Sequence, residues 1–387
     1  MKRFTVVVLT ALLVGCSPGP EDVAGPSPEL ACPTSADKPL ALAVGARANV
    51  PTPKVPAAVE DLMTRVVRAH SAVTLIRVDG DPKVVFSDPA PAREGNENAD
   101  NVALDEYTTA IASAFREATP AQVAEADPLT ALGIAAKRVD EGGTIALLDS
   151  GLQTTAPLRF DSEPLLSAEP AEVADYLREE KLLPDLTGRT VLLVGIGETA
   201  QPQPKLDNRR SANLVATWKA VAEAAGACVD ALDLGETTDS VVSTPRVAVV
   251  TPPAPPAPLT PCGEVELGEA DNVSFLPDSA EFKDRPAARR TLEQLAGVVR
   301  DERQRVELVG RTASSGPEAG RISLSAQRAD AVKGVLEELG VEAGRITTRG
   351  VGTNWPTHVP DIGPGGVLLP GPAAQNRKVV VKLTCEG

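Results

Sequence analysis

One arginine stands in the apolar stripe of an expected helix near the C-terminus. Residues 306–310 are an apolar run that predicts a strand, and a loop rich in Gly, Ser and Pro follows. The next helix carries one stripe at steps of three and four, made of Leu324, Arg328, Val332, Val335, Leu336 and Leu339. If Arg328 is about one turn into this helix, the helix dipole disfavours it, and an anion held between its guanidinium and the N-terminal amides would reverse that effect. The pattern predicts a carboxylate-binding site.

The same region, about a third of the chain, resembles the OmpA-like peptidoglycan-binding domain. The matching pieces, in chain order, are VSFLPDSAEF at 273–282 with Phe275, GRTASSG at 310–316, Leu324-Ser325, Arg328-Ala329, Val332, GVG at 350–352 and NRKV at 376–379. The resemblance implies an α+β domain over 262–387, with a mixed sheet, helices on one side and a pocket for the diaminopimelate stem peptide of the cell wall.

The resemblance also implies which residues form this pocket. Arg328 corresponds to the arginine that holds the ligand's carboxylate. The expected peptidoglycan-binding set is Thr312, Ala313, Leu324, Arg328, Asn376 and Arg377. Arg377 has two open interpretations, a second contact to an anionic ligand or a surface charge.

Three positions depart from the family pattern. Ala313 stands where the family carries the Asp that grips the ammonium of diaminopimelate, Arg311 replaces a His, and Arg321 replaces an Asn. Losing one of two charged partners costs about a few kcal/mol of binding. The sequence therefore leaves open whether peptidoglycan binding is weakened, altered or lost.

The N-terminus predicts export and lipidation. Lys2 and Arg3 precede an apolar run over 4–14, which is too short to span a bilayer stably. The run ends in LVGC, which resembles the lipoprotein box and implies a lipid on Cys16; an ordinary signal peptide is the alternative. Residues 17–37 are polar and contain several prolines, so we expect a flexible tether. The sequence does not distinguish an outer membrane from a single cell membrane.

The four other cysteines, an even number in an exported chain, favour two disulfides. Three pairings are possible. We favour Cys32–Cys228 and Cys262–Cys385, because each would clasp the ends of one domain. A zinc site is the alternative, but the chain has no CxxC spacing and only two histidines.

Strand and helix patterns alternate over 38–250, which predicts an α/β domain with a doubly wound, mostly parallel sheet covered on both faces. We expect strands at 40–44, 73–78, 144–148, 190–194 and 228–234, and helices at 55–69, 104–117, 128–139, 171–180 and 209–225. The order of elements, with DSG at 149–151 after a central strand, resembles a von Willebrand factor A-like domain. The metal motif DxSxS of such domains is missing, because the first strand runs into GARAN at 45–49.

A dinucleotide fold is a second interpretation of this domain. VLLVGIGETA at 191–200 contains a G-x-G-x-x-A string after a strand, but the prolines of QPQP at 201–204 oppose the helix that should hold the pyrophosphate. Polar residues are expected to cluster at the carboxyl edge of the sheet, namely Arg47, Asn49, Asp149, Gln153, Thr154, Glu198 and Gln203. The sequence leaves open whether this edge binds a ligand or a protein partner, and it does not identify either.

The net charge and the few histidines argue against further classes of function. The formal charge of −15 opposes nucleic-acid binding. His70 and His358 have no GxSxG nearby, so no catalytic set emerges, and we expect neither metal nor cofactor. A Pro-rich spacer at 251–261 separates the domains. The chain reads as a non-enzymatic, membrane-anchored envelope lipoprotein that tethers to peptidoglycan; the alternative is an extracytoplasmic protein-interaction scaffold that has lost wall binding.

Overall fold

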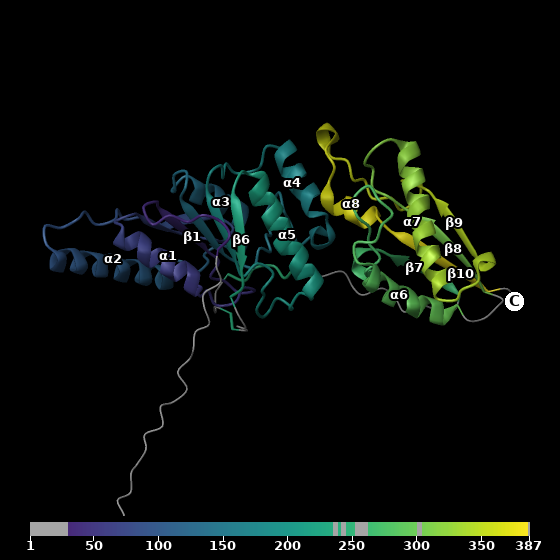
Figure 1. Ribbon diagram of the computed structural model, residues 1–387, viewed down its shortest axis with the longest axis horizontal. Coiled ribbons are helices and arrows are strands. Elements are labelled where there is room, and N and C mark those ends of the chain that lie inside the picture. The colour runs from purple at the N-terminus through teal and green to yellow at the C-terminus, as the bar shows by residue number, and fades with distance from the viewer. Residues whose placement is uncertain (1–29, 235–238, 241–244, 252–261, 300–303, 386–387) are drawn as a thin grey trace, which may run out of the picture.

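The computed structural model shows two sheets, each packed with its own helices, that lie one after the other along the length of the molecule (Figure 1). The structure describes residues 30–234, 239–240, 245–251, 262–299 and 304–385. Cys16 with the expected signal peptide, most of the expected tether and nearly all of the Pro-rich spacer lie outside these residues. No helix in the described ranges is both long enough and apolar enough to cross a bilayer.

The first sheet has six strands in the order β3-β2-β1-β4-β5-β6, and only β3 runs antiparallel to its neighbour. The strands are β1 (Leu40–Val44), β2 (Val73–Arg77), β3 (Lys83–Phe86), β4 (Thr144–Leu148), β5 (Thr190–Val194) and β6 (Cys228–Leu232). Every residue of β1, β2, β4 and β5 is buried, as expected of parallel strands covered on two faces. The predicted parallel-rich sheet is confirmed, and the edge strand β3 is an addition to it.

Helices cover both faces of this sheet. They are α1 (Ala57–Arg68), α2 (Glu97–Glu117), α3 (Pro128–Ala136), the short η1 (Leu165–Ser167), α4 (Pro170–Glu179) and α5 (Asn208–Ala224). Leu40, Leu42 and Val44 pack with α1 and α2, whereas Ala41 and Ala43 between them pack with α3, α4 and α5. Because successive side chains of β1 point to opposite faces of the sheet, this strand contributes to two separate hydrophobic cores.

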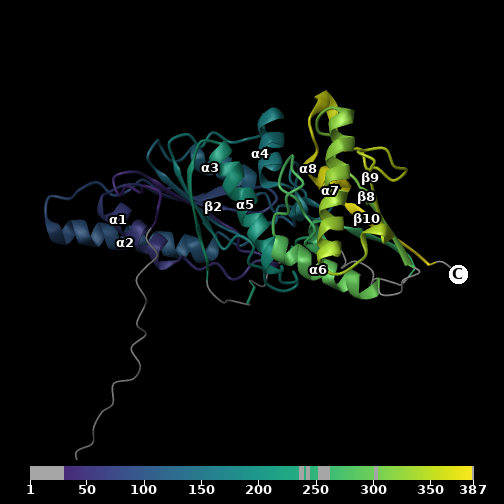
Figure 2. The ribbon, with the colours of Figure 1, turned by 45° about the vertical axis from the view of Figure 1, so that its right-hand side comes forward.

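The second sheet has four strands in the order β7-β10-β8-β9 and is mixed, with β8 and β9 parallel and the other pairs antiparallel. The strands are β7 (Gly263–Leu267), β8 (Gln304–Gly310), β9 (Ile346–Gly350) and β10 (Val379–Cys385). The helices are α6 (Arg285–Val298), α7 (Glu318–Glu338) and α8 (Pro370–Asn376), with short turns η2 (Glu269–Asp271), η3 (Ala343–Arg345) and η4 (Pro364–Gly366). Helices α6 and α7 lie along one face and share a core with β8 and β10 (Figure 2).

Two glycines allow α7 to lie close to the sheet. A Cβ on Gly310, at the end of β8, would lie 1.8 Å from the Ser325 carbonyl oxygen, and one on Gly350 would lie 2.3 Å from the Ala326 nitrogen. Only glycine permits this approach of helix to strand.

Replacing Gly310 by alanine is expected to lower the free energy of unfolding by about 1–3 kcal/mol, because α7 must move away from β8. Chemical denaturation followed by circular dichroism measures the change. Gly334→Ala is the matched control, because Gly334 lies inside α7 with no atom within 4 Å of its added Cβ. The control should stay neutral or gain stability. Equal losses in both variants would contradict the close-approach argument.

The disulfides join Cys32 to Cys228 and Cys262 to Cys385. These are the two pairings that the sequence favours. The first ties the segment before β1 to the start of β6, and the second ties the residue before β7 to the end of β10. Each bond therefore connects the two ends of one domain.

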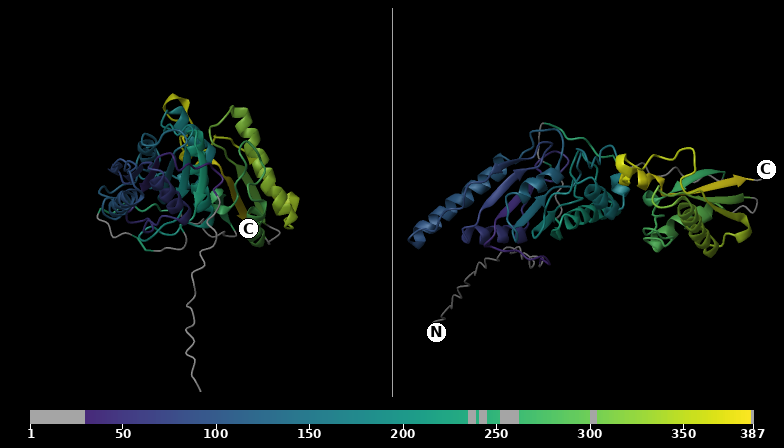
Figure 3. Two further views of the ribbon diagram at one scale, coloured as in Figure 1. Left: turned by 60° about the vertical axis from the view of Figure 1, so that its left-hand side comes forward. Right: turned by 90° about the horizontal axis from the view of Figure 1, so that it is seen from above.

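The two domains meet through α8 and its surroundings (Figure 3). Ala374 of α8 packs against the core of the first domain, and a Cβ on Gly371 would lie 3.2 Å from Pro164 Cδ. Arg209 of α5 donates hydrogen bonds to the carbonyl oxygens of Glu269 and, at 3.0 Å, Ala270. The segment between β9 and β10, which contains α8, thus contributes a docking surface.

Candidate functional site

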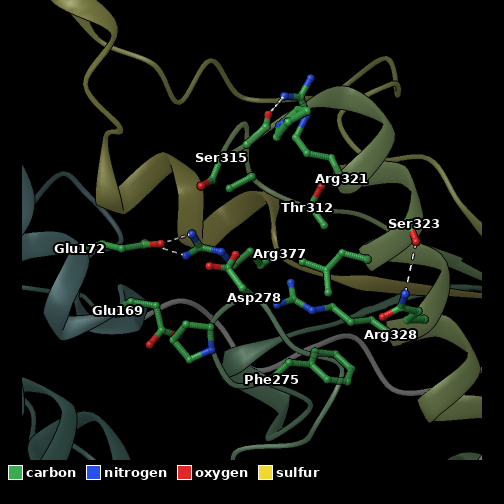
Figure 4. A pocket seen from close by; sticks show the side chains of 17 residues that line it. Glu169, Glu172, Phe275, Asp278, Thr312, Ser315, Arg321, Ser323, Arg328 and Arg377 are labelled. Carbon is green, nitrogen blue, oxygen red and sulfur yellow. Dashed lines mark hydrogen bonds and ion pairs between the residues drawn. The ribbon is translucent and has the colours of Figure 1, made fainter.

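A cavity of about 390 Å³ lies between α4 of the first domain and the start of α7 in the second (Figure 4). Three stretches of chain line it: the start of α4, the loop at 275–278, and residues between 312 and 328. Arg377, at the end of α8, completes the lining. The cavity therefore belongs to both domains, whereas the sequence predicts a pocket within the second domain alone.

Arg328 reaches this cavity from α7. Its side chain is only 5% exposed, with Nε donating to the Ser279 carbonyl oxygen at 2.9 Å and Nη2 to the Leu276 carbonyl oxygen at 3.3 Å. The guanidinium carbon also lies 5.2 Å from the centre of the Phe275 ring. No carboxylate among the described residues forms an ion pair with it. Arg328 is thus a buried cation whose hydrogen-bond partners are neutral carbonyl oxygens, and it lines the cavity.

The expected position of Arg328 near the helix start is wrong. Helix α7 begins at Glu318, so Arg328 lies about 15 Å further along the axis at 1.5 Å per residue. Its guanidinium cannot share an anion directly with the first amides of α7. The sequence misled because the first six residues of α7, EAGRIS, carry no apolar stripe that would mark the helix.

The environment of Arg328 favours an anion for another reason. Burial and the neighbouring Arg377 lower the pKa of Arg328 to about 10, against the smaller opposing effects of Asp278, Glu169 and Glu172. The side chain is still charged at neutral pH. A ligand carboxylate would supply the compensation that its surroundings lack.

Three more residues of the expected binding set lie in the lining: Thr312, Ala313 and Leu324. Thr312 is buried, and its hydroxyl makes no hydrogen bond to a described residue. A buried hydroxyl without a partner is costly, and a ligand polar group would satisfy it. Ala313 contributes only a methyl group at the position where the family carries an acid.

The last two expected residues behave differently from each other. Arg377 lines the cavity and binds both carboxylate oxygens of Glu172, at 2.9 Å for one of the two contacts. Asn376 is buried and is not in the cavity lining; its Nδ2 donates to Asp361 at 3.0 Å and its Oδ1 accepts from the Val359 amide. These partners lie within the second domain, and the expected part of Asn376 in peptidoglycan binding stays a prediction.

Ser314, His358 and Asp361 come together beside Asn376, a combination of side chains that hydrolases use. Ser314 Oγ lies 3.5 Å from His358 Nε2, and Asp361 Oδ1 lies 3.7 Å from that same nitrogen. A catalytic relay needs the hydroxyl and the carboxylate on opposite nitrogens of the ring. Asp361 instead accepts from the Ser314 amide at 2.9 Å and anchors the loop.

Arg311 belongs to a cluster of charged side chains on the second sheet. Glu266 of β7 forms ion pairs of 2.6 Å with both Arg311 and Lys378. The guanidinium of Arg311 also lies 5.1 Å from the centre of the Trp355 ring. Burial raises the pKa of Glu266, but the hydrogen bonds and charges of Lys378 and Arg311 together leave it lowered.

This lowered pKa predicts a pH-dependent contribution to stability. Because the folded-state pKa of Glu266 lies below its ordinary 4.5, the contribution is present above pH 4.5 and is lost as the pH falls through the lowered value. The melting temperature of wild type should exceed that of Glu266→Gln near pH 7, and the difference should shrink as the pH falls below 4.5. Glu281→Gln, an exposed change in the same domain, should show no such gap. A difference in melting temperature that persists in acid would show that ionised Glu266 is not the source of the stabilisation.

The carboxyl edge of the first sheet is occupied by the chain itself. Arg47 binds both oxygens of Asp149, at 2.5 and 2.9 Å, and the two side chains are 1% and 0% exposed. Asn49 Nδ2 donates to the Val247 carbonyl oxygen at 3.2 Å, and Gln203 exchanges hydrogen bonds with the backbone of Val250. The other members of the expected cluster, Gln153, Thr154 and Glu198, also bond to backbone groups. The segment 247–250, which the sequence did not place, covers this edge.

Two further acids of the cavity, Glu169 and Glu172, were not predicted. Both lie at the start of α4, more than a hundred residues before Arg328 in the chain. No local pattern links them to the second domain. Asp278, the third acid of the lining, lies inside the VSFLPDSAEF run that carries the family resemblance.

Comparisons with known proteins agree with this description of the second domain. A model of the OmpA family matches residues 274–359. The probable lipoprotein YiaD of Escherichia coli (strain K12) is 35% identical over 119 residues, which are 30% of this chain and 50% of YiaD. Photosystem I P700 chlorophyll a apoprotein A2 of Gloeobacter violaceus is 34% identical over 125 residues, or 32% of this chain and 14% of that protein. The chain thus spans half or less of these two relatives.

A solved structure, the peptidoglycan-associated lipoprotein from Burkholderia pseudomallei, is 22% identical with a TM-score of 0.24 and covers 28% of this chain and 86% of its own. The chain ends in an OmpA-like domain, as the sequence predicts.

Proposed function

We propose that this protein is a non-enzymatic, lipid-anchored protein of the cell envelope whose OmpA-like domain binds peptidoglycan non-covalently. The observation that carries the proposal is Arg328, a buried and charged side chain that lines an open cavity and has no ion-pair partner among the residues that the structure describes. The expected ligand group is a carboxylate of the diaminopimelate stem peptide. The family match to residues 274–359 and the likeness to a probable lipoprotein support this assignment.

The first domain is proposed to be a von Willebrand factor A-like module for a partner not yet identified. Its strand order, with β1 and β4 adjacent at the centre and helices on both faces, supports the proposal. The Arg47–Asp149 pair lies at the edge where open α/β sheets bind ligands. Because both side chains are fully engaged, a partner would contact the surface around them.

Sedimentation with purified sacculi tests the wall-binding proposal. The chain from residue 17 onward should pellet with wall material, and Arg328→Gln should lower the affinity at least about tenfold, because hydrogen bonds to charged groups contribute about 1.5–3 kcal/mol. Arg349→Gln is the matched control, since Arg349 is exposed and paired with Glu307 outside the cavity. Equal pelleting of wild type and both variants would remove Arg328 from the site. Failure of wild type to pellet would favour the protein-interaction scaffold instead.

A further inference from the structure

One arginine of the cavity already holds a carboxylate from the other domain. Three guanidiniums line the cavity, those of Arg321, Arg328 and Arg377. Nη1 of Arg321 donates to the Gly316 carbonyl oxygen, and Arg328 donates to carbonyl oxygens of its own domain. Both terminal nitrogens of Arg377 instead bind the carboxylate of Glu172, one of them at 2.9 Å. Among the residues that the structure describes, Arg377 is thus the cavity arginine with an ion-pair partner.

The geometry of this pair is the one by which arginine binds the acid of a ligand. A guanidinium recognises a carboxylate best through two parallel hydrogen bonds, one to each oxygen. Glu172 supplies such a carboxylate from the first turn of α4, and Figure 4 shows the two side chains pointing toward each other at the cavity. Glu172 therefore occupies the nitrogens with which Arg377 would otherwise meet an acidic ligand.

Arg377 is close enough to Arg328 to act on the same ligand. Both side chains line the cavity. Burial is the main cause that lowers the pKa of Arg328, and the charge of Arg377 is the next. Two guanidiniums that repel each other in this way would both gain from an acidic ligand beside them.

The pair between the domains can be displaced by an anion from solvent. The side chains of Arg377 and Glu172 are 20% and 25% exposed, whereas those of the Arg47–Asp149 pair are 1% and 0% exposed. An incoming acid can therefore reach Arg377. After the exchange, the carboxylate of Glu172 would contact water, so it would not carry the large cost of a buried charge without a partner.

Other contacts between the domains keep Glu172 beside Arg377. Lys283 Nζ lies 2.5 Å from Glu169, which precedes α4. Arg209 donates to two carbonyl oxygens of the second domain, and Ala374 of α8 packs against the core of the first. A tethered group competes at an effective concentration on the order of millimolar or more. A separate ligand must overcome this competition before it binds Arg377.

We propose that Glu172 is an autoinhibitory contact: the first domain places its carboxylate on Arg377, and an acidic group of the wall ligand must displace it for full binding. This inference rests on the proposed wall-binding function. It adds to that function a way in which the first domain limits the affinity of the second.

Sedimentation of the chain from residue 17 onward with purified sacculi, over a series of protein concentrations, tests the proposal. Glu172→Ala should raise the affinity by about tenfold, the equivalent of one hydrogen bond to a charged group, because it releases Arg377. Glu179→Ala, an exposed change at the other end of α4, is the matched control and should bind as wild type does. Glu172→Ala/Arg377→Gln should bind no better than wild type, since the gain depends on the released guanidinium.

The outcomes separate this inference from the wall-binding proposal. If Glu172→Ala binds only as well as wild type, or less well, the inference is wrong and wall binding stands. A gain that persists in Glu172→Ala/Arg377→Gln would also overturn the inference, because the loss of a negative charge would then be the cause. If neither wild type nor Glu172→Ala pellets with sacculi, wall binding fails and the inference fails with it.

Discussion

Arg47→Met is expected to lower the free energy of unfolding by about 3–5 kcal/mol, because it leaves a buried carboxylate without its partner. Asp149 is 0% exposed, and Arg47 binds both of its oxygens. After the change, the hydrogen bond from the Gly151 amide at 2.8 Å is the one that Asp149 keeps within the described part of the chain. Chemical denaturation at neutral pH, followed by fluorescence of the buried Trp218 in the same domain, measures the loss.

Two controls separate the buried charge from the loss of an arginine as such. Arg47→Met/Asp149→Asn removes both charges and should recover a large part of the stability, since paired replacement of a buried ion pair is often close to neutral. Arg65→Met breaks a pair with Asp61 in which both side chains are about half exposed or more, and should cost under about 1 kcal/mol. If Arg47→Met lowers the free energy of unfolding no more than Arg65→Met does, the buried Arg47–Asp149 pair does not stabilise this edge more than an exposed pair would.

The pair also shows how the expected polar cluster comes together at this edge. Arg47 lies in the turn after β1, and Asp149 follows β4, so neighbouring parallel strands bring them to the same edge. The sequence predicts that meeting from strand direction alone. It does not predict the 247–250 segment that closes over the edge, because nothing local in that stretch points back to Asn49 or Gln203.

Strands were predictable where burial on both faces leaves an uninterrupted apolar run. The bounds of β1, β4 and β5 agree with the prediction residue for residue. The edge strands β3 and β7 were missed because both are largely exposed or half-exposed, and KVVF and GEVEL carry no strong pattern. Helix α2 begins at Glu97, well before the predicted 104, since Asn96 caps two polar turns that an apolar stripe cannot reveal.

In the candidate site, the family resemblance named five residues that line the cavity, namely Thr312, Ala313, Leu324, Arg328 and Arg377. Two features of this region could not be predicted, because they depend on contacts between distant parts of the chain. Asn376 is hydrogen-bonded to Asp361, which lies between β9 and α8. Glu172 meets Arg377 across 205 residues of chain, a pairing that depends on how two domains dock. Local sequence predicts helix and strand propensity and the register of strands. It does not predict how one domain docks on the other.

Removing the Cys32–Cys228 disulfide is expected to destabilise the first domain by about 5 kcal/mol in the chain-entropy model, because the bond closes a loop of 196 residues. This is the largest single loss that we predict. It compares with a total of about 5–15 kcal/mol for ordinary domains, so Cys32→Ser/Cys228→Ser should be close to unfolded at physiological temperature. The melting temperature, measured by calorimetry without reductant, checks the expectation.

Cys262→Ser/Cys385→Ser provides the matched comparison, since its bond closes a loop of 123 residues in the second domain. Loop-closure entropy grows only with the logarithm of loop length, so the two losses should differ by less than about 1 kcal/mol. Each variant should lower the transition of its own domain first, and the other domain should follow only as far as α8 and the Glu172–Arg377 pair couple them. If the first variant unfolds at the wild-type temperature, then the segment before β1 is held by its other contacts, among them the hydrogen bond from the Cys32 amide to Asp230, and the covalent clasp adds little.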